Sequence, residues 1–320
     1  MSDAALPDKI AVGHAPAAGL IRRALDSDIF YSFRRSRLTM VAAIITLLFF
    51  ALAIAAPLIA VQNPFDPSEL QLMNSRIAPL WTADGQSPFL LGTDEQGRDV
   101  LSAILYGLRI SLVVGILGVI LSGALGIALG LIAGYFGGAI DALIMRIADV
   151  QLTFPAILTA LLVDGVIGAA LPKDLHTDLQ LYVMIFAIGI SVWPGFARTI
   201  RGSTLVERNK DYVMAARVIG LSSTRVMLTH VLPNVIGPVL VIGTLALGNA
   251  ILTEATLSFL GVGLPPTEPS LGTLIRIGND FLFSGEWWVT IYPGIALVLM
   301  VLSINLLGDW LRDALNPRLR

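Results

Sequence analysis

The chain has 320 residues, of which 55% are hydrophobic and only 14% are charged, and its mean hydropathy is +0.79. Soluble domains carry roughly a quarter charged residues, so this composition excludes an ordinary soluble protein and indicates an integral membrane protein. The absence of cysteine excludes disulfides and thiolate metal sites. The three histidines lie far apart in the sequence and form no cluster with the spacing of metal ligands. The net charge of −2 is uninformative, because the placement of charge matters more than its sum.

The first 37 residues precede any apolar run long enough to cross a membrane. Between residues 28 and 37, the apolar residues Ile29, Phe30 and Phe33 share one helical face, and the arginines share another. A helix of this kind lies in the headgroup layer with its cations near anionic lipids. We therefore expect residues 1–37 to be a cytoplasmic segment that ends in an interfacial helix.

Six apolar runs approach the roughly 20 residues that a helix needs to cross the hydrocarbon core. The third is the weakest, because Arg146 and Asp149 interrupt it, and Pro155 predicts a kink within it. The runs cover residues 38–60, 110–133, 142–163, 181–197, 235–259 and 287–307. The expected fold class is therefore an all-α membrane protein with six transmembrane helices.

The distribution of basic residues predicts the orientation. With six spans and a cytoplasmic N-terminus, most of the 21 Lys and Arg residues fall on the cytoplasmic side, as the positive-inside rule requires. A five-span chain would put the basic cluster from Arg198 to Arg225 outside, so six spans are favoured. The expected divisions after the first span are an extracytoplasmic segment at 61–99, a five-helix membrane core at 100–310 with a cytoplasmic loop at 199–233, and a cytoplasmic tail at 311–320.

Catalytic motifs are absent from the sequence. A P-loop requires Ser or Thr after its lysine, whereas the three lysines here are followed by Ile10, Asp174 and Asp211. Neither the H-E-x-x-H motif of metalloproteases nor a rhomboid-like G-x-S-G motif is present. We therefore expect no catalytic residue, no metal and no cofactor bound by the chain itself, and a lipid bilayer rather than a nucleic acid as its surroundings.

A short polar stretch at 211–220 separates two long apolar runs. Asp211 is the expected N-cap, and Gly220 fits the position after the helix, where a positive φ costs nothing. Tyr212, Ala215, Ala216 and Ile219 follow the spacing of one helical face. The pattern predicts a short helix whose exposed small-residue face binds another protein; from spacing alone, an ordinary cytoplasmic loop is an equal alternative.

A second short helix is expected to begin at Ser222 or Ser223. We expect it to end before Leu232 and Pro233, because a proline disfavours helical geometry in the residue before it. Leu232 and Pro233 would then form a stiff hinge between this helix and the fifth span.

This stretch resembles the EAA loop of the membrane subunits of ATP-binding-cassette importers. The loop pattern is Glu-Ala-Ala, three residues, Gly, nine residues, an aliphatic position, one residue and then Leu-Pro. Met214 replaces the glutamate and His230 replaces the aliphatic residue. The positions that match at the right spacing are Ala215, Ala216, Gly220, Leu232 and Pro233.

Further motifs resemble the dipeptide, oligopeptide and nickel permeases, and in particular the "C" type of their two paired subunits. They lie in the correct order at residues 91–102, 106–109, 193–198, 254–261 and 305–318. The resemblance implies a bacterial inner-membrane permease that pairs with a second, homologous permease and receives peptides from an extracytoplasmic binding protein. It also implies two separate ATPases, which bind the ATP and Mg²⁺. A nickel-chelate, glutathione or other small-metabolite importer is an alternative.

The resemblance also assigns roles within the loop. It implies that the helix is a coupling helix in a groove of one ATPase and that Pro233 transmits its movement to the fifth span. The residues expected to contribute to this coupling are Asp211, Tyr212, Met214, Ala215, Ala216, Gly220, Leu232 and Pro233.

Four small residues in the second span recur at intervals of four. Small residues at this spacing let two helices approach closely in lipid, so we expect helix packing rather than a role in translocation. The residues are Ser122, Gly126, Gly130 and Gly134. The sequence does not indicate whether the packing partner belongs to the same chain or to the second permease.

Glu254 is a carboxylate deep within an apolar run, and it must be paired, protonated or beside water. A structural hydrogen bond is favoured over a role in the pathway, and a secondary transporter driven by protons through Glu254 is the competing class of function. Trp193 and Pro194 are expected to break or kink the fourth span, either as a gating hinge or as a helix end. Arg98 and Asp99 are expected to join an internal ion-pair network, or to contact the binding protein or an outer gate.

Overall fold

The structure is a computed structural model that describes residues 28–265 and 268–315. Within these residues it contains helices and two isolated bridges but no strand. Five helices of the described chain are long and apolar enough to cross a membrane, or six if one bent pair forms a single span. The all-α membrane fold is therefore confirmed. Of the predicted terminal segments, residues 1–27 and 316–320 lie outside the described residues.

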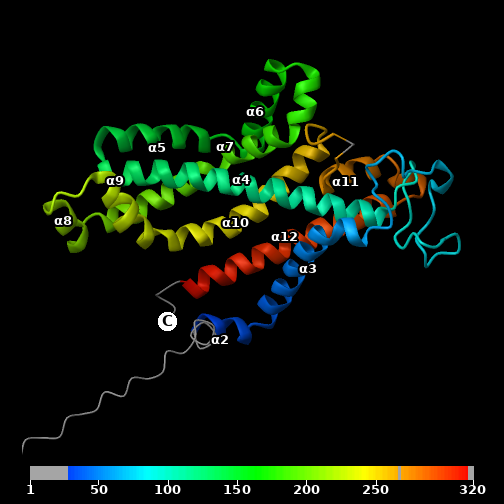
Figure 1. The fold of residues 1–320 in the computed structure, drawn as a ribbon, viewed down its shortest axis with the longest axis horizontal. Helices are drawn as coiled ribbons and strands as arrows, with labels where there is room; N and C mark the ends of the chain where they lie inside the picture. The colour runs from blue at the N-terminus through cyan, green and yellow to red at the C-terminus, as the bar shows by residue number, and fades with distance from the viewer. Residues whose placement is uncertain (1–27, 266–267, 316–320) are drawn as a thin grey trace, which may run out of the picture.

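The long helices run between two ends of the molecule (Figure 1). The loop end contains the segment 60–99, with the 3₁₀ turn η1 (Leu72–Asn74), and also α11 (Leu271–Asn279) and η3 (Leu282–Ser284). The α8 end is opposite and contains the short helix α8 (Asp211–Val218). The five long helices are α3 (Arg37–Ile59), α4 (Val100–Phe136), α7 (Lys173–Glu207), α10 (Leu232–Phe259) and α12 (Trp288–Leu315).

The expected interfacial segment is a helix, α2 (Asp28–Arg35), and it lies beside the last part of α12 (Figure 1). The rings of Phe33 and Trp310 form an edge-to-face pair with centroids 5.2 Å apart. Ser36 caps α3 by accepting a hydrogen bond from the Thr39 amide at 3.3 Å. The chain therefore turns sharply from α2 into the first long helix.

The third predicted span is a bent pair rather than one helix. α5 (Gly138–Leu152) and α6 (Ala156–Ala170) meet at an angle of 96°. Pro155 disfavours helical geometry at Phe154 and cannot donate a backbone hydrogen bond, so the helix ends there. α5 lies along α4 and α7, whereas α6 projects away from the long axis of the molecule (Figure 1).

α7 does not end at its proline, so the alternative of a helix end at Pro194 is wrong. The helix continues through Pro194 to Glu207, well beyond the predicted end at Ala197. A proline leaves the carbonyl four residues earlier without its helical donor, and this carbonyl belongs to Ile190. Gln151 of α5 supplies the missing bond, because its Nε2 donates to the Ile190 oxygen. The sequence misled because the compensating residue is distant in the chain.

The expected stop before Leu232 and Pro233 is also wrong. α9 (Ser223–Val226) continues through a π-helical stretch, η2 (Met227–Val231), directly into α10. Leu232 is itself helical, with φ −53° and ψ −47°. Pro233 follows this π-helical stretch directly, and the changed hydrogen-bond register of the π-helix accommodates its missing amide hydrogen. Residues 223–259 consequently form one uninterrupted helix.

Candidate functional site: the α8 surface, the Glu254 cluster and the loop end

The end of α8 is fixed by a Schellman motif. Gly220 adopts φ +85°, a conformation that costs glycine little. The Leu221 amide donates to the Ala216 carbonyl at 3.1 Å, and the Gly220 amide donates to the Arg217 carbonyl at 3.0 Å. At the other terminus Lys210, not Asp211, is the N-cap, so the predicted cap is displaced by one residue. Asp211 is in the first turn, where the helix dipole favours a negative charge.

The two faces of α8 differ from the predicted ones. Ala216 is only 4% exposed and packs, with Val213, against the bundle, so the expectation that Ala216 lies on the exposed face is wrong. The reason is that Val213 and Ala216 are three residues apart and share the inward face. The outward face consists of Met214, Ala215, Val218 and Ile219. Val218 is 87% exposed and Ile219 74% exposed, so the face is strongly apolar.

Hydrogen bonds join α8 to both neighbouring long helices. The Tyr212 hydroxyl donates to Glu207 at the end of α7 and accepts from Asn234 Nδ2 at 3.0 Å. Asn234 Nδ2 also donates to the His230 carbonyl at 2.7 Å. Desolvation and the neighbouring Glu207 carboxylate raise the pKa of Tyr212 to about 12. The hydroxyl therefore stays protonated at neutral pH, and α8 remains attached to α7 and α10.

A second contact fixes α8 to α4. The guanidinium carbon of Arg217 lies 4.5 Å from the centroid of the Tyr135 ring, within the range of a cation–π interaction. Arg208, at the end of α7, donates to the carbonyl of Gly134 at 2.8 Å. Leu232 packs against the apolar cluster that contains Val213 and Ala216, and Pro233, the next residue, is exposed. The predicted coupling residues thus gather at one end of the molecule, on a helix anchored to three others.

Glu254 lies at the junction of α4, α10 and α11. It is completely buried, and each carboxylate oxygen accepts a hydrogen bond: Oε2 from Ser111 at 2.8 Å and Oε1 from Ser258 at 2.7 Å. Ser111 Oγ in turn accepts from the amide of Leu271 at the start of α11, at 3.3 Å. This geometry is that of a structural hydrogen-bond cluster. Ser258 follows Glu254 by one helical turn, so the spacing of these two residues is a signal of the cluster in the sequence.

The glycine stripe of α4 lies against α7 of the same chain, which identifies the partner that the sequence left open. A Cβ on Gly130 would lie 2.6 Å from the carbonyl oxygen of Ala197, and one on Gly134 would lie 2.6 Å from the Cβ of Thr204. A Cβ on Gly126 would clash with Phe196 in the same way. Ser122 is completely buried at the start of the stripe. The two backbones therefore approach more closely than any side chain at these positions would allow.

Trp193 and Gln151 form a contact between α5 and α7. The Trp193 Nε1 donates to Gln151 Oε1 at 2.8 Å, while Gln151 Nε2 donates to the carbonyl that Pro194 leaves free. One amide side chain thus satisfies two groups of α7. The gating role of Trp193 and Pro194 stays a prediction, but their immediate surroundings are those of a packed helix contact.

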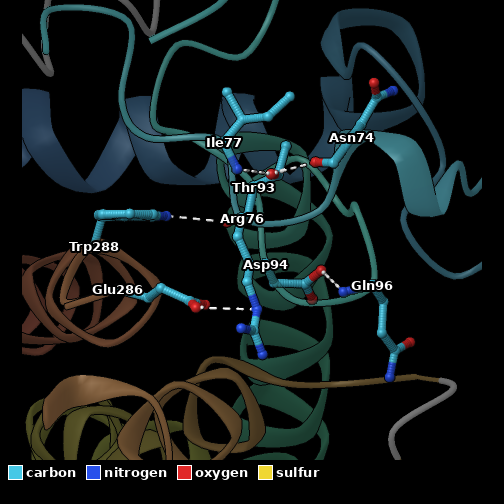
Figure 2. Close-up of polar contacts among 8 residues, drawn as sticks. All are labelled: Asn74, Arg76, Ile77, Thr93, Asp94, Gln96, Glu286 and Trp288. Carbon is cyan, nitrogen blue, oxygen red and sulfur yellow. Dashed lines mark hydrogen bonds and ion pairs between the residues drawn. The ribbon is translucent and has the colours of Figure 1, made fainter. Parts of the chain in front are cut away.

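The loop end is organised around Thr93 (Figure 2). Its hydroxyl donates to the Asn74 carbonyl at 2.6 Å and accepts from the Ile77 amide at 2.8 Å, and its carbonyl accepts from Trp288 Nε1 at 3.0 Å. Arg76 pairs with Glu286 at 3.1 Å in the same region. The segment 60–99 is therefore fastened to the start of α12.

Asp94, Arg98 and Asp99 are buried in this region. Asp94 accepts from the Gln96 and Arg98 amides at 2.8 and 2.9 Å, and Arg98 donates to Gln96 at 2.5 Å. Asp99 caps α4 through the amide and hydroxyl of Ser102, at 2.8 and 2.6 Å. Burial raises the pKa of both aspartates. Within the described residues this network is built from hydrogen bonds, and its one ion pair is Arg76 with Glu286 rather than a pair involving Arg98 or Asp99.

Comparison with known families identifies the class of protein. Residues 126–320, which include α8 and Glu254, match the family described as "Binding-protein-dependent transport system inner membrane component". Residues 27–79 match "N-terminal TM domain of oligopeptide transport permease C". The chain belongs to this family of permeases. It is a transport subunit without catalysis of its own, and the resemblance drawn from the sequence motifs is confirmed.

Several relatives match almost the whole chain. The dipeptide transport system permease protein DppC of Haemophilus influenzae is 38% identical over 92% of this chain and 95% of the relative. The di/tripeptide transport system permease protein DppC of Pseudomonas aeruginosa is 38% identical over 97% and 98% of the two chains. Among solved structures, the inward-facing MetNI methionine ABC transporter aligns with a TM-score of 0.49 at 18% identity, over 68% of this chain and 96% of that chain. The likeness to the peptide permeases is a likeness of sequence over nearly the whole chain.

Proposed function

We propose that this permease is one of two paired membrane subunits of an ATP-driven importer of short peptides. The names of its relatives, which are dipeptide and di/tripeptide permeases, support the peptide cargo. In this proposal a second, homologous permease completes the pathway, and an extracytoplasmic binding protein delivers the peptide at the loop end. Two ATPases hold ATP and Mg²⁺ at the α8 end, so that α8 and both chain termini lie in the cytoplasm of a bacterial cell.

The apolar outward face of α8 is the observation on which the coupling proposal rests. Val218 and Ile219 are large, apolar and exposed on a helix that is nonetheless firmly anchored. An apolar face of this kind on an anchored helix fits a groove on a partner protein. Met214 extends the same face where the EAA pattern has glutamate, so the contact with the ATPase is more apolar than ionic.

The replacement Val218→Lys tests this coupling. A lysine ammonium would have to be desolvated in the ATPase groove, so we expect peptide-stimulated ATP hydrolysis and uptake to fall by about tenfold or more in proteoliposomes. The matched control is Thr224→Lys, which adds the same charge at an exposed position outside the α8 face. Normal membrane insertion of both variants, with loss of coupling only in the first, is the expected result. Undiminished uptake by Val218→Lys would contradict the proposal.

A further inference from the structure

A hollow of about 530 Å³ opens at the loop end, between the segment 60–99 and the beginnings of α4 and α7. Its size is within the range of small-molecule sites, which are ≈300–1,000 Å³. The walls combine apolar side chains with two residues of opposite charge, Arg109 from α4 and Glu268 from the connection before α11. Neither residue belongs to the network around Thr93 and Asp94 or to the Glu254 cluster.

Arg109 and Glu268 have no partner within the described part of the chain. The ion pairs found there join Arg76 to Glu286, Arg198 to Asp149 and Arg201 to Asp141. Arg109 follows the buried Leu108 on a strongly apolar helix, and both Arg109 and Glu268 are exposed. An unpaired cation on an apolar helix is a candidate functional residue.

The other walls suit a small amphipathic molecule. The rings of Phe65 and Tyr106 pack edge to face, with centroids 5.7 Å apart, and form an aromatic side of the hollow. Asn63 completes the rim, and its Oδ1 is already occupied by the Phe65 amide at 3.2 Å. A few fixed polar groups on apolar and aromatic walls are typical of sites that orient a ligand.

The hollow continues along one face of α4. A second hollow of about 320 Å³ shares Arg109 and Val113 with it, and its remaining walls are apolar. A third hollow of about 450 Å³ shares Ile116 with the second and reaches Ile127, toward the α8 end. Positions 109, 113, 116, 120, 123 and 127 repeat every three or four residues, so they form one stripe of the helix. The charged pair therefore lies where an apolar strip begins.

We propose that this hollow binds the zwitterionic backbone of a short peptide, with Arg109 on the terminal carboxylate and Glu268 on the terminal ammonium. A guanidinium binds a carboxylate through two parallel hydrogen bonds, and a carboxylate is the natural partner of an ammonium group. The aromatic pair contacts the cargo side chains, which can vary. The peptide nature of the cargo rests on the proposed function, whereas the demand for two terminal charges comes from the hollow itself.

The absence of cysteine allows a direct binding test. In the purified complex carrying Val113→Cys, modification of the thiol by a methanethiosulfonate reagent is timed with and without alanyl-alanine at millimolar concentration. We expect the dipeptide to slow modification about fivefold or more, and the N-acetyl amide of the same dipeptide, which lacks both charges, to have no effect. Adding Arg109→Gln or Glu268→Gln should abolish the protection. Equal protection by both compounds, or none by the dipeptide, would overturn the proposal whether or not the protein imports peptides.

Transport provides the second test. In proteoliposomes containing both permeases, the ATPases and the binding protein, Arg109→Gln and Glu268→Gln are each expected to reduce alanyl-alanine uptake about tenfold. Stimulation of ATP hydrolysis by the loaded binding protein should be retained, and Glu95→Gln, which removes a carboxylate outside the hollow, should transport normally. Uptake at the unmodified rate by both variants overturns the site while leaving the importer intact. Loss of the second permease from the purified variant complexes also overturns it, because the charges would then serve assembly.

Discussion

At the scale of single residues, polar groups within the bundle are matched to partners that lie far away in sequence. Glu254 shows this most clearly, because Ser111 is 143 residues distant and still donates to its carboxylate. Ser258 donates to the second oxygen, so neither faces apolar side chains without a partner. A carboxylate held in this way is poorly placed to exchange protons with water. The geometry therefore gives no support to a carrier driven through Glu254.

The replacement of Glu254 by leucine should reveal how much this cluster contributes to the free energy of unfolding. Two buried hydroxyls would lose their acceptor, so we expect the free energy of unfolding to fall by about 2–4 kcal/mol. Glu254→Gln keeps an acceptor oxygen and should lose less, about 1 kcal/mol. Thermal unfolding of the purified permease pair measures both. A leucine variant as stable as the unmodified protein would show that the cluster contributes nothing.

At the scale of helices, Gln151 and Pro194 act as a pair. Gln151→Leu would leave the Ile190 carbonyl and the Trp193 indole without partners, which is expected to cost about 2–3 kcal/mol. Pro194→Ala restores a backbone N–H for the same carbonyl. In that background Gln151→Leu should therefore cost distinctly less, about half as much. The measurement is a double-mutant cycle in thermal or denaturant unfolding, and strictly additive effects would refute the pairing.

The glycine stripe makes a second prediction at this scale. Gly130→Leu forces α4 away from α7, because even a Cβ at this position lies 2.6 Å from the Ala197 oxygen. We expect a loss of about 3 kcal/mol or failure to accumulate in the membrane. Gly202→Ala is the control. It adds a methyl group to α7, the helix that packs against the stripe, at a position where a Cβ meets nothing within 4 Å. Its stability should be unchanged or slightly raised.

The sequence predicted the long helices better than their ends. Apolar runs locate the spans, but α7 continues to Glu207 through polar residues that an apolar run does not include. Prolines misled at two positions, since the effect of Pro194 depends on Gln151 and that of Pro233 on a π-helical register. The inward orientation of Ala216 was equally hidden. Local spacing identifies a helical face, but only the packing of the whole bundle decides which face turns inward.

At the scale of the whole molecule, the fold separates two ends with different chemistry. The α8 end carries the apolar outward face of α8, and the loop end carries the unpaired Arg109 and Glu268. An importer needs this arrangement, because the cargo arrives on the side opposite to the ATPases. By the positive-inside rule, we propose that the α8 end lies in the cytoplasm.

Single cysteines in this cysteine-free chain can measure that orientation. Thr224→Cys reports on the α8 end and Asp84→Cys on the segment 60–99, and both positions are exposed. A membrane-impermeant maleimide applied to intact cells stripped of their outer membrane should label the second variant only. After the membrane is opened, both should react. Labelling of Thr224→Cys in sealed cells would invert the proposed orientation and remove the ATPases from α8.

The uninterrupted helix from Ser223 to Phe259 has a mechanical consequence. At 1.5 Å per residue, Ser223 lies at most about 46 Å from Glu254, so the carboxylate held by the two serines can serve as the pivot of a long lever. A tilt of only about 5° around that point displaces the far end by roughly 4 Å, about three quarters of the helical pitch. A small movement of the ATPases would therefore rotate this helix slightly, while the position of Glu254 would hardly change.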